Sequence, residues 1–411
     1  MTVSLSESER LDERIREVVS RDLCSGCGAC TLLDSGLDMR ENEAGYLRPV
    51  RSTRGMVDTR AEVTFRKICP GVTVSSNRAY GSKRHPVMGS YREMWVSWAL
   101  DSEMRHRGSS GGVLTALSAW LLESGRAARV VGAQAAPDPR RSIPVTITTR
   151  AEALAAAGSR YTPVATLSAP DVLLANSAVV AKPCEASALS SLVAPLKEQG
   201  IDPLILSFFC AGTPSAIATD RLLLTLGVES TTPLEELWYR GHGWPGRFTA
   251  RDGATTVSVG YDESWGSALG PTTQWRCKVC PDGVGESADI VAADYWQVDG
   301  RGYPIFSEGD GTSALIARTK RGAEVIREAA RAGIIHIEIA RMNSLAAVQP
   351  LQRDRRSFLA ARILGSILAG RPTPVFRGFG LIRLSLRHPL RAMSVSRGTY
   401  SRIRRARNAS V

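Results

Sequence analysis

The chain has 411 residues, of which 43% are hydrophobic, so it is long enough for two or three packed units of about 150 residues each. Its formal net charge of +12 is uneven, because residues 371–411 carry ten Arg and no Lys, Asp or Glu, which leaves +2 for the other 370 residues. The near-neutral body argues against a nucleic-acid enzyme, the polar residues 1–21 contain no secretory signal, and no apolar run approaches the about 18 residues of a membrane span.

These exclusions predict a cytoplasmic protein, in which thiols stay reduced. The first expected element is a short amphipathic helix over residues 9–20, which leads into three closely spaced cysteines. Residues 36–80 are rich in Gly and Arg with only short apolar pieces, so we expect mainly loops there. Residues 1–85 are therefore predicted to form a small N-terminal region, organised by a cofactor more than by its own core.

Strands and helices are expected to alternate from residue 94 onward. The strands are predicted at 94–100, 130–135, 177–181 and 204–209, and the helices at 113–122, 151–157, 183–192 and from about 215. The turn of residues 108–112 precedes the first of these helices, where Ser109 or Ser110 can cap the helix and Gly125 can end it. This alternation predicts an α/β unit with a largely parallel sheet.

Beyond residue 238 the pattern favours strands and loops. A hairpin is expected over 248–260, strands at 288–294 and 312–319, and helices at 322–332 and 355–369. The predicted fold class is α/β (mixed α+β), with an α/β domain over 86–335 and an extension over 336–411. We expect the Arg-rich end of the extension to be solvated or partly disordered; the alternative is contact with an acidic protein or with an anionic membrane surface, which would make the protein membrane-peripheral.

Eight cysteines divide into two sets of four, the number needed for two four-thiolate metal sites. The first set is Cys24, Cys27, Cys30 and Cys69. Its two-residue gaps let three thiolates converge on one iron–sulfur cube, whereas zinc, the alternative, usually binds pairs of thiols. The second set is Cys184, Cys210, Cys277 and Cys280. It holds one C-x-x-C pair and two cysteines near strand ends, where α/β sheets build sites; the alternative is that Cys184 and Cys210 are structural thiols.

The turn of residues 108–112, Gly-Ser-Ser-Gly-Gly, is a candidate anion cradle. Free N–H groups, hydroxyls and the dipole at a helix start favour a phosphate or a flavin pyrophosphate, although the same turn also suits a plain helix start. No G-x-G-x-x-G follows a strand and no Walker A motif occurs, so neither a Rossmann nor a P-loop site is predicted. Taken by their chemistry alone, Lys182 and Asp294 are compatible with ordinary surface charges.

In this order, the motifs resemble the coenzyme F-420 hydrogenase/dehydrogenase beta subunit family, which also includes 7-hydroxymethyl chlorophyll a reductase. The matching segments are 24–30, 109–113, 158–161, 182–189, 209–212, 239–246, 277–280 and 288–294. The resemblance implies a ferredoxin-like N-terminal iron–sulfur domain and, over 86–335, an FAD-binding domain with a mixed sheet that also holds the second iron–sulfur site. The eight cysteines would then hold two 4Fe-4S clusters. It also implies flavin-binding roles for Ser109, Ser110, Gly111, Gly112, Tyr161, Lys182 and Asp294.

The chain departs from the family pattern at two positions that we can identify. Ala181-Lys182 precedes Pro183-Cys184 where the family often has Gly-Thr, and Ala293 stands where Gly usually precedes the strand-end Asp. These differences leave the substrate open.

The implied cofactors suggest a mechanism. Iron–sulfur clusters pass single electrons and a deazaflavin exchanges hydride, so FAD, which does both, belongs between them. We expect an oxidoreductase that passes electrons between coenzyme F-420 and one-electron carriers such as ferredoxin, with no catalytic side chain identified. The alternatives are a ferredoxin-dependent reductase of an organic substrate, a non-catalytic electron-transfer subunit of a larger complex, and a zinc-stabilised binding protein.

Overall fold

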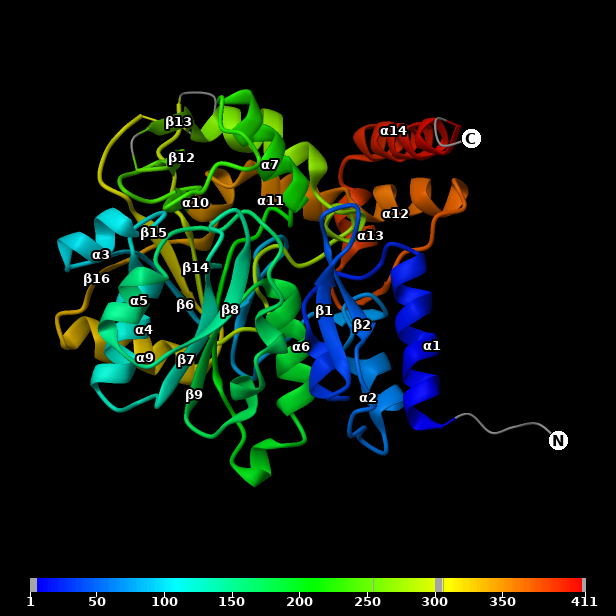
Figure 1. Cartoon of the computed structure of the whole chain (residues 1–411), viewed down its shortest axis with the longest axis horizontal. Helices are drawn as coiled ribbons and strands as arrows, with labels where there is room; N and C mark the ends of the chain where they lie inside the picture. Colours follow the sequence, from blue (N-terminus) through cyan, green and yellow to red (C-terminus); the bar gives the residue numbers. More distant parts are fainter. Residues whose placement is uncertain (1–5, 254, 300–304, 306, 409–411) are drawn as a thin grey trace.

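A computed structural model describes residues 6–253, 255–299, 305 and 307–408. At its centre is one eight-stranded mixed sheet, with the strand order β16-β6-β15-β14-β10-β9-β7-β8 (Figure 1). Four neighbouring strands run parallel: β14 (Ile290–Asp294), β10 (Leu204–Phe208), β9 (Ser177–Ala181) and β7 (Arg129–Ala135). At one edge, β8 (Ser142–Ile147) pairs antiparallel with β7. On the other side, β15 (Ser313–Ala317) pairs antiparallel with β14, and β6 (Glu93–Ala99) pairs antiparallel with both β15 and β16 (Ile335–Ile339). The prediction of a largely parallel sheet is thus right for the central strands and wrong for both edges.

The central strands are buried on both faces because neighbouring residues point to opposite sides. Ala178, Leu206 and Ile290 belong to one core, and the adjacent residues Val179, Ile205 and Val291 belong to the other. Helices α4 (Val113–Glu123), α5 (Arg150–Ala155) and α9 (Lys320–Arg331) cover the first face. Helix α6 (Pro183–Val193) and the N-terminal segment cover the second. A strand that is buried on both faces has a continuous apolar sequence, and this pattern predicted β7, β9 and β10.

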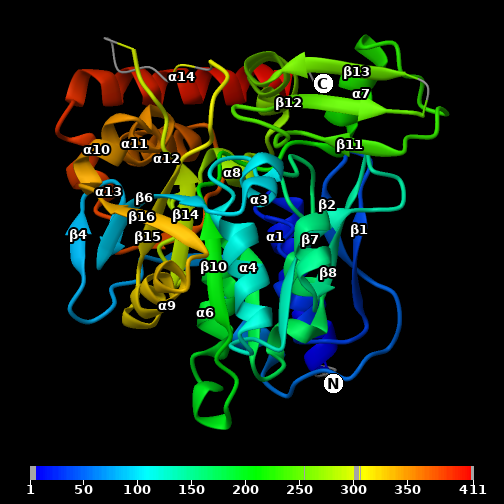
Figure 2. The ribbon, with the colours of Figure 1, turned by 90° about the vertical axis from the view of Figure 1, so that its left-hand side faces the viewer.

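A small three-stranded sheet lies beyond one end of the central sheet (Figure 2). It consists of β11 (Glu236–Trp238), β12 (Arg247–Arg251) and β13 (Thr256–Gly260), and the β12–β13 pair confirms the predicted hairpin. Helix α7 (Ala216–Thr225) and a π-helical turn, Asp262–Leu269, pack on it through a core of their own.

The N-terminal segment contains more regular structure than expected. Helix α1 (Glu7–Ser20) confirms the predicted helix, and a capping box between Ser6 and Glu9 begins it. The part predicted as loops forms the hairpin β1 (Leu37–Glu41)–β2 (Leu47–Arg51), helix α2 (Ala61–Ile68) and strand β3 (Thr73–Ser75). Their apolar side chains share a core with α6 and the sheet, so few are needed locally. The short strands β4 (Lys83–His85) and β5 (Gly89–Tyr91) lead into β6.

The C-terminal extension is also folded, contrary to the expectation of a solvated or disordered tail. It comprises α10 (Met342–Ala347), α11 (Pro350–Ser357), α12 (Leu359–Leu368), β17 (Val375–Arg377), α13 (Leu381–Ser385) and α14 (Pro389–Asn408). Helix α14 lies along α12 so closely that a Cβ on Gly365 would come within 2.3 Å of the carbonyl oxygen of Ser396. Strand β17 pairs in parallel with β3 and ties the extension to the N-terminal segment.

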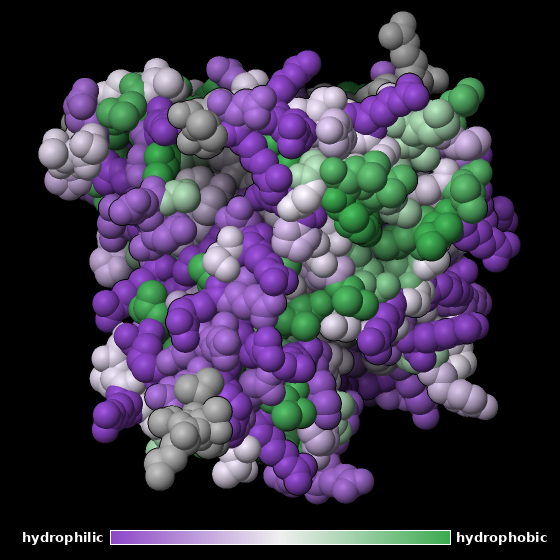
Figure 3. Space-filling model, turned by 90° about the vertical axis from the view of Figure 1, so that its right-hand side faces the viewer, coloured by the Kyte–Doolittle hydropathy of each residue, from purple (hydrophilic) through white to green (hydrophobic). Residues whose placement is uncertain are grey.

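The surface of the extension carries a patch of apolar side chains (Figure 3). Residues 409–411, at the end of the Arg-rich tail, lie outside the described part. In the part that is described, no helix has both the length and the apolar character needed to cross a membrane.

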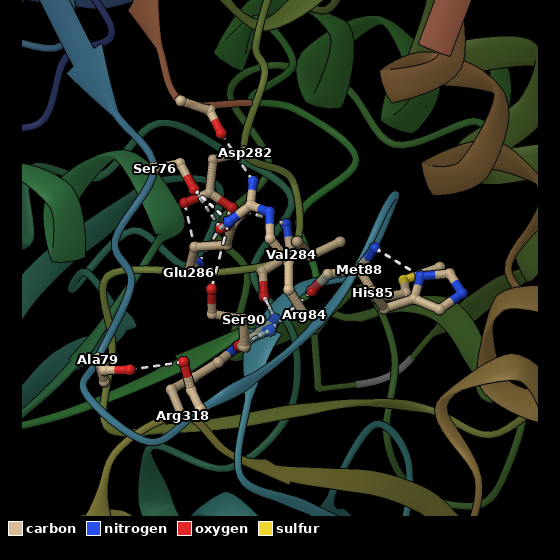
Figure 4. A network of polar contacts seen from close by, with 12 residues as sticks. Ser76, Ala79, Arg84, His85, Met88, Ser90, Asp282, Val284, Glu286 and Arg318 are labelled. Carbon is tan, nitrogen blue, oxygen red and sulfur yellow. Dashed lines mark hydrogen bonds and ion pairs between the residues drawn. The ribbon is translucent and has the colours of Figure 1, made fainter. Parts of the chain in front are cut away.

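A buried network of charges joins the separate parts of the chain (Figure 4). The carboxylate of Glu286 pairs with Arg356 of α11 and, at 3.5 Å, with Arg84 of β4, and it accepts a hydrogen bond of 2.7 Å from the hydroxyl of Ser76. Arg318 donates to the carbonyls of Met88 and Ser90, both at 2.7 Å. Burial acts to raise the pKa of Glu286, but the guanidinium groups around it lower the pKa more, so that it lies below its ordinary value. The N-terminal segment, the sheet and the extension therefore meet at one carboxylate.

This network predicts a large effect of a small substitution. Glu286→Gln keeps the side-chain shape but removes the carboxylate that pairs with the buried guanidinium of Arg356, so the free energy of unfolding should fall by about 3–5 kcal/mol. Urea unfolding followed by tryptophan fluorescence would measure the loss. Glu338→Gln is the control, because the Glu338 side chain is 61% exposed; equal urea midpoints for the two variants would contradict the prediction.

Candidate cofactor site

A cavity of about 450 Å³ opens at the carboxyl ends of the parallel strands, and its volume is in the range of cofactor sites. Lys182 follows β9, Cys210 follows β10, and Asp294 ends β14, and all three line the cavity. Parallel strands deliver the residues at their carboxyl ends to one edge of a sheet. Of the residues predicted to bind the flavin, all but Gly111 line this one cavity, namely Ser109, Ser110, Gly112, Tyr161, Lys182 and Asp294.

The turn before α4 is held differently from the prediction. The N-cap is Gly112, at a φ of 71°, and no side chain caps the helix, so neither serine has the capping role. Ser109 accepts a hydrogen bond from the hydroxyl of Ser159 at 2.7 Å. Ser110 donates to the carbonyl of Thr312 at 2.9 Å, which fastens the turn to the strand β15 region. The helix start that lines the cavity therefore lacks a side-chain acceptor, a condition that suits a bound anion.

Gly111 lies behind this turn. Its N–H donates to the hydroxyl of Ser313 at 2.9 Å, and a Cβ here would come within 2.7 Å of the carbonyl oxygen of Ser97. The residue therefore allows the turn to approach the sheet closely and does not face the cavity.

Lys182 contributes a buried positive charge to the cavity wall. Its Nζ lies 2.6 Å from both the carboxylate of Glu185 and the carbonyl oxygen of Val164. Burial acts to lower the pKa of Lys182, but Glu185 and the thiols of Cys184 and Cys210 raise it above the ordinary value. The ammonium group therefore stays charged between the cavity and the second cysteine set.

The carboxylate of Asp294 is already paired with other side chains of the protein. Arg240 holds it with two hydrogen bonds of 2.9 and 2.8 Å, and the indole N–H of Trp244 donates to it at 3.2 Å. Arg240 also lies over the rings of Tyr261 and Trp296, with its guanidinium carbon 4.6 and 5.2 Å from their centroids. Burial acts to lower the pKa of Arg240, but Asp294 raises it well above its ordinary value. Together these residues form a rigid, charged wall.

Aromatic rings make up another part of the wall. Tyr161, which was predicted, lies with its centroid 4.9 Å from that of Trp265 and 6.4 Å from that of Tyr261. The sequence analysis missed Arg240, Tyr261, Trp265 and Trp296, all of which line the cavity. The one available signal was that Arg240 belongs to the Gly/Trp/Pro-rich segment 239–246. His242 of that segment stacks on Trp238 instead, at 4.4 Å between centroids, and is not among the lining residues.

The first cysteine set is gathered between α1 and α2. Cys24, Cys27 and Cys30 lie in the loop after α1, and Cys69 is the C-cap of α2. Burial raises the pKa of Cys30 well above its ordinary value, and the other three thiols raise it further, so the four groups lie within electrostatic reach of one another. The N–H of Gly26 donates to the sulfur of Cys24 at 3.4 Å.

The second set is gathered at the carboxyl ends of β9 and β10. Cys184 lies in the first turn of α6, Cys210 follows β10, and Cys277 lies in α8 (Trp275–Lys278), with Cys280 shortly after it. Burial raises the pKa of Cys210 to about 12, with a further contribution from Cys277. The N–H of Thr213 donates to the sulfur of Cys277 at 3.4 Å.

The two cysteine sets adjoin each other. The side-chain amide of Gln274 donates to the carbonyl of Ser25 at 2.9 Å and to the sulfur of Cys277 at 3.6 Å. The buried Arg276 donates to the carbonyl of Pro70, next to Cys69, at 2.9 Å. Burial acts to lower the pKa of Arg276, but the thiols of the second set raise it. One guanidinium group thus lies within electrostatic reach of both cysteine sets.

All eight cysteines are free thiols. Among the residues that the structure describes, no three or more His, Cys, Asp or Glu side chains form a group that could hold a metal ion. The donor chemistry of the two sets nevertheless fits an iron–sulfur cluster, because each offers four thiols, an N–H group directed at a sulfur, and the nearby guanidinium of Arg276.

The comparisons with known proteins agree on one family. The N-terminal model of the coenzyme F-420 hydrogenase/dehydrogenase beta subunit matches residues 94–170, and its C-terminal model matches residues 174–342. The coenzyme F-420 hydrogenase subunit beta of Methanothermobacter thermautotrophicus is 25% identical over 310 residues, which cover 70% of this chain and 99% of that protein. A chain of the F-420-reducing nickel–iron hydrogenase complex from Methanosarcina barkeri has a similar fold, with a TM-score of 0.55 at 20% identity, over 71% of this chain and 98% of that one.

The buried thiols predict a distinctive reactivity. In folded, chelator-treated protein at about pH 8, Cys27, Cys30, Cys184 and Cys210 should react slowly with Ellman's reagent, because burial raises each thiol pKa and keeps the thiolate scarce. In urea without reductant, all eight free thiols should react. A titre below eight in urea, or fast reaction of all eight in protein that circular dichroism shows to be folded, would contradict this prediction.

Proposed function

We propose a function from one premise: this chain belongs to the coenzyme F-420 hydrogenase/dehydrogenase beta subunit family and is therefore an electron-transfer oxidoreductase component. On that premise, the chain binds FAD in the cavity and a 4Fe-4S cluster on each cysteine set. It passes electrons between coenzyme F-420 and a one-electron carrier.

The observation that carries this proposal is the position of Cys210. This residue belongs to the second cysteine set and also lines the cavity. A flavin in the cavity and a cluster on the second set would therefore share a wall. Gln274 contacts both Cys277 of the second cysteine set and Ser25, which lies next to Cys24 of the first set, so the two sets are also neighbours. The flavin site, the second cysteine set and the first cysteine set would therefore lie in series, as a path for single electrons requires.

The cavity wall suits the two ends of FAD. The uncapped start of α4 and the ammonium group of Lys182 favour the pyrophosphate. The rings of Tyr161, Tyr261 and Trp265 favour a flat aromatic ring system. Bound FAD would accept hydride and release single electrons. The task of this chain's residues would be to hold the flavin, keep water from it and fix its distance from Cys210.

A basic hollow beside the second set supports the proposed one-electron carrier. The hollow measures about 330 Å³ and is lined by Cys277, Lys278, Arg355 and Arg362, among others. Burial lowers the pKa of Lys278, and the neighbouring guanidinium groups of Arg371 and Arg362 lower it further. This concentration of positive charge suits an acidic carrier such as ferredoxin, because opposite charges steer such partners together.

A second candidate function follows from what the relatives are named. One is a subunit of coenzyme F-420 hydrogenase and the other a chain of a hydrogenase complex. This chain would then relay electrons inside a larger complex, with residues 1–85 as the part that holds the first cluster. A ferredoxin-dependent reduction of an organic substrate is a further alternative that the same experiment distinguishes.

The absorption spectrum of anaerobically purified protein tests the cofactors. We expect flavin bands at about 450 nm on top of a broad iron–sulfur absorption. We also expect about eight iron atoms per chain. Cys210→Ser should remove the second cluster and about half of the iron while flavin stays bound. A colourless protein with stoichiometric zinc would overturn the proposal.

Stopped-flow mixing then identifies the donor. Bleaching of the flavin by reduced coenzyme F-420 would support hydride exchange, whereas reduction by ferredoxin alone would favour the organic-substrate reductase. Reduction by neither, in protein that holds both cofactors, would favour the relay subunit.

Lys182 provides a test of the flavin site that needs no activity measurement. The double variant Lys182→Met/Glu185→Gln replaces the buried ion pair by neutral side chains, so no unpaired charge remains to unfold the site. The dissociation constant for FAD, measured from flavin fluorescence, should rise about tenfold, equivalent to about 1.4 kcal/mol. The control is Lys320→Met, because the Lys320 side chain is 78% exposed on α9. An unchanged dissociation constant in the double variant would exclude Lys182 from the flavin site.

A further inference from the structure

Large apolar side chains are concentrated on the surface of the C-terminal extension. Among the described residues, nine of the twenty exposed large hydrophobic side chains fall within residues 364–400. Four of them are spaced three or four residues apart from α13 into α14: Ile382, Leu386, Leu390 and Met393, which are 72%, 69%, 81% and 51% exposed. Leu364, Ile367 and Leu368 form a second group on α12. Figure 3 shows apolar side chains gathered on this side of the molecule.

Arginines lie next to three of these apolar side chains in the sequence. Arg383 follows Ile382, Arg387 follows Leu386, and Arg391 follows Leu390, and each of the three arginines is exposed. Within the described part of the chain, only two of the ten arginines after residue 370 pair with a carboxylate, Arg371 with Asp22 and Arg391 with Asp354. Since residues 371–411 contain no acidic residue, this surface keeps a large positive charge.

The surface is rigid. Ser396, Thr399 and Ile403 of α14 are buried against the rest of the extension, and a Cβ on Gly365 of α12 would come within 2.3 Å of the carbonyl oxygen of Ser396. The pairing of β17 with β3 anchors the chain between α12 and α13. A partner of this surface therefore meets apolar and basic groups already held in place, without the cost of ordering a flexible tail.

We propose that this face, formed by α12, α13 and α14, binds the surface of an anionic membrane. Helices that lie in the membrane interface combine bulky aliphatic side chains, which reach the acyl boundary, with arginines at the level of the head groups. The alternation of Ile382, Leu386 and Leu390 with arginines has that composition. Guanidinium groups bind phosphate through paired hydrogen bonds, and each basic residue near the surface strengthens the attraction to anionic lipid.

A protein partner fits this face less well. The cores of protein interfaces are depleted in charged residues and enriched in aromatic ones. Here Ile382, Leu386 and Leu390 are each followed directly by an arginine in the sequence. Tyr400 is the one aromatic among the nine exposed apolar residues. A flat protein surface would have to remove water from several unpaired guanidinium groups, which is costly. Lipid head groups leave those groups hydrated and paired with phosphate.

Vesicle flotation with the full chain tests the proposal. The wild-type protein should float with phosphatidylcholine vesicles that contain 30% phosphatidylserine, at least about tenfold more than with phosphatidylcholine alone, and added salt should release it. The charge variant Arg383→Gln/Arg387→Gln/Arg397→Gln should bind about a hundredfold more weakly. The apolar variant Ile382→Ser/Leu386→Ser/Leu390→Ser should lose binding by about tenfold or more at unchanged charge.

The matched control, Arg54→Gln/Arg78→Gln/Arg331→Gln, removes the same charge from exposed positions outside the extension and should change binding little. All substituted side chains are exposed, so circular dichroism should show each variant folded. Absence of flotation by the wild type, or equal losses in the charge variant and the control, would overturn the proposal. It would also fail if sedimentation showed that the apolar variant abolishes self-association while vesicle binding stays intact, or if only an acidic protein bound.

Discussion

Three parallel strands that end at one edge of a sheet are the constraint on which the rest of this structure depends. In a parallel sheet the carboxyl end of every strand lies on the same side, so the residues at the carboxyl ends of β9, β10 and β14 are neighbours however far apart they are in the sequence. Lys182, Cys210 and Asp294 occupy these three positions. The cavity, its positive charge and its contact with the second cysteine set all follow from this arrangement.

Buried charges hold the surrounding parts together. Glu286 meets arginines from β4 and α11, Arg240 holds Asp294, and Arg276 lies between the two cysteine sets. Glu286 and Arg240 have their compensating groups on other segments of the chain, and Arg276 donates to the carbonyl of Pro70 on the N-terminal segment. Because an uncompensated buried charge is costly, the segments must come together for any of them to be stable. The same interactions that stabilise the fold also place positive charge beside the cavity and the thiols.

The family models and the structure divide the chain in an informative way. The matched segments span residues 94–342, which contain the second cysteine set and all of the cavity lining except residues 348–352. The first cysteine set and most of the C-terminal extension lie outside them. Lys182, at the position where the chain departs from the family pattern, turns out to pair with Glu185 at 2.6 Å in the cavity wall.

The sequence by itself was enough for the central strands and the helices that follow them, because apolar runs are local patterns. It was not enough for the edge strands β8 and β16 or the hairpin β1–β2, whose side chains are only partly buried and carry a weak pattern. Nor did it reveal the cap at Gly112, the pairing of Arg240 with Asp294, or the packing of α14 on α12. These features depend on residues far apart in the sequence, whose burial and charge pairing are decided only when the chain has folded.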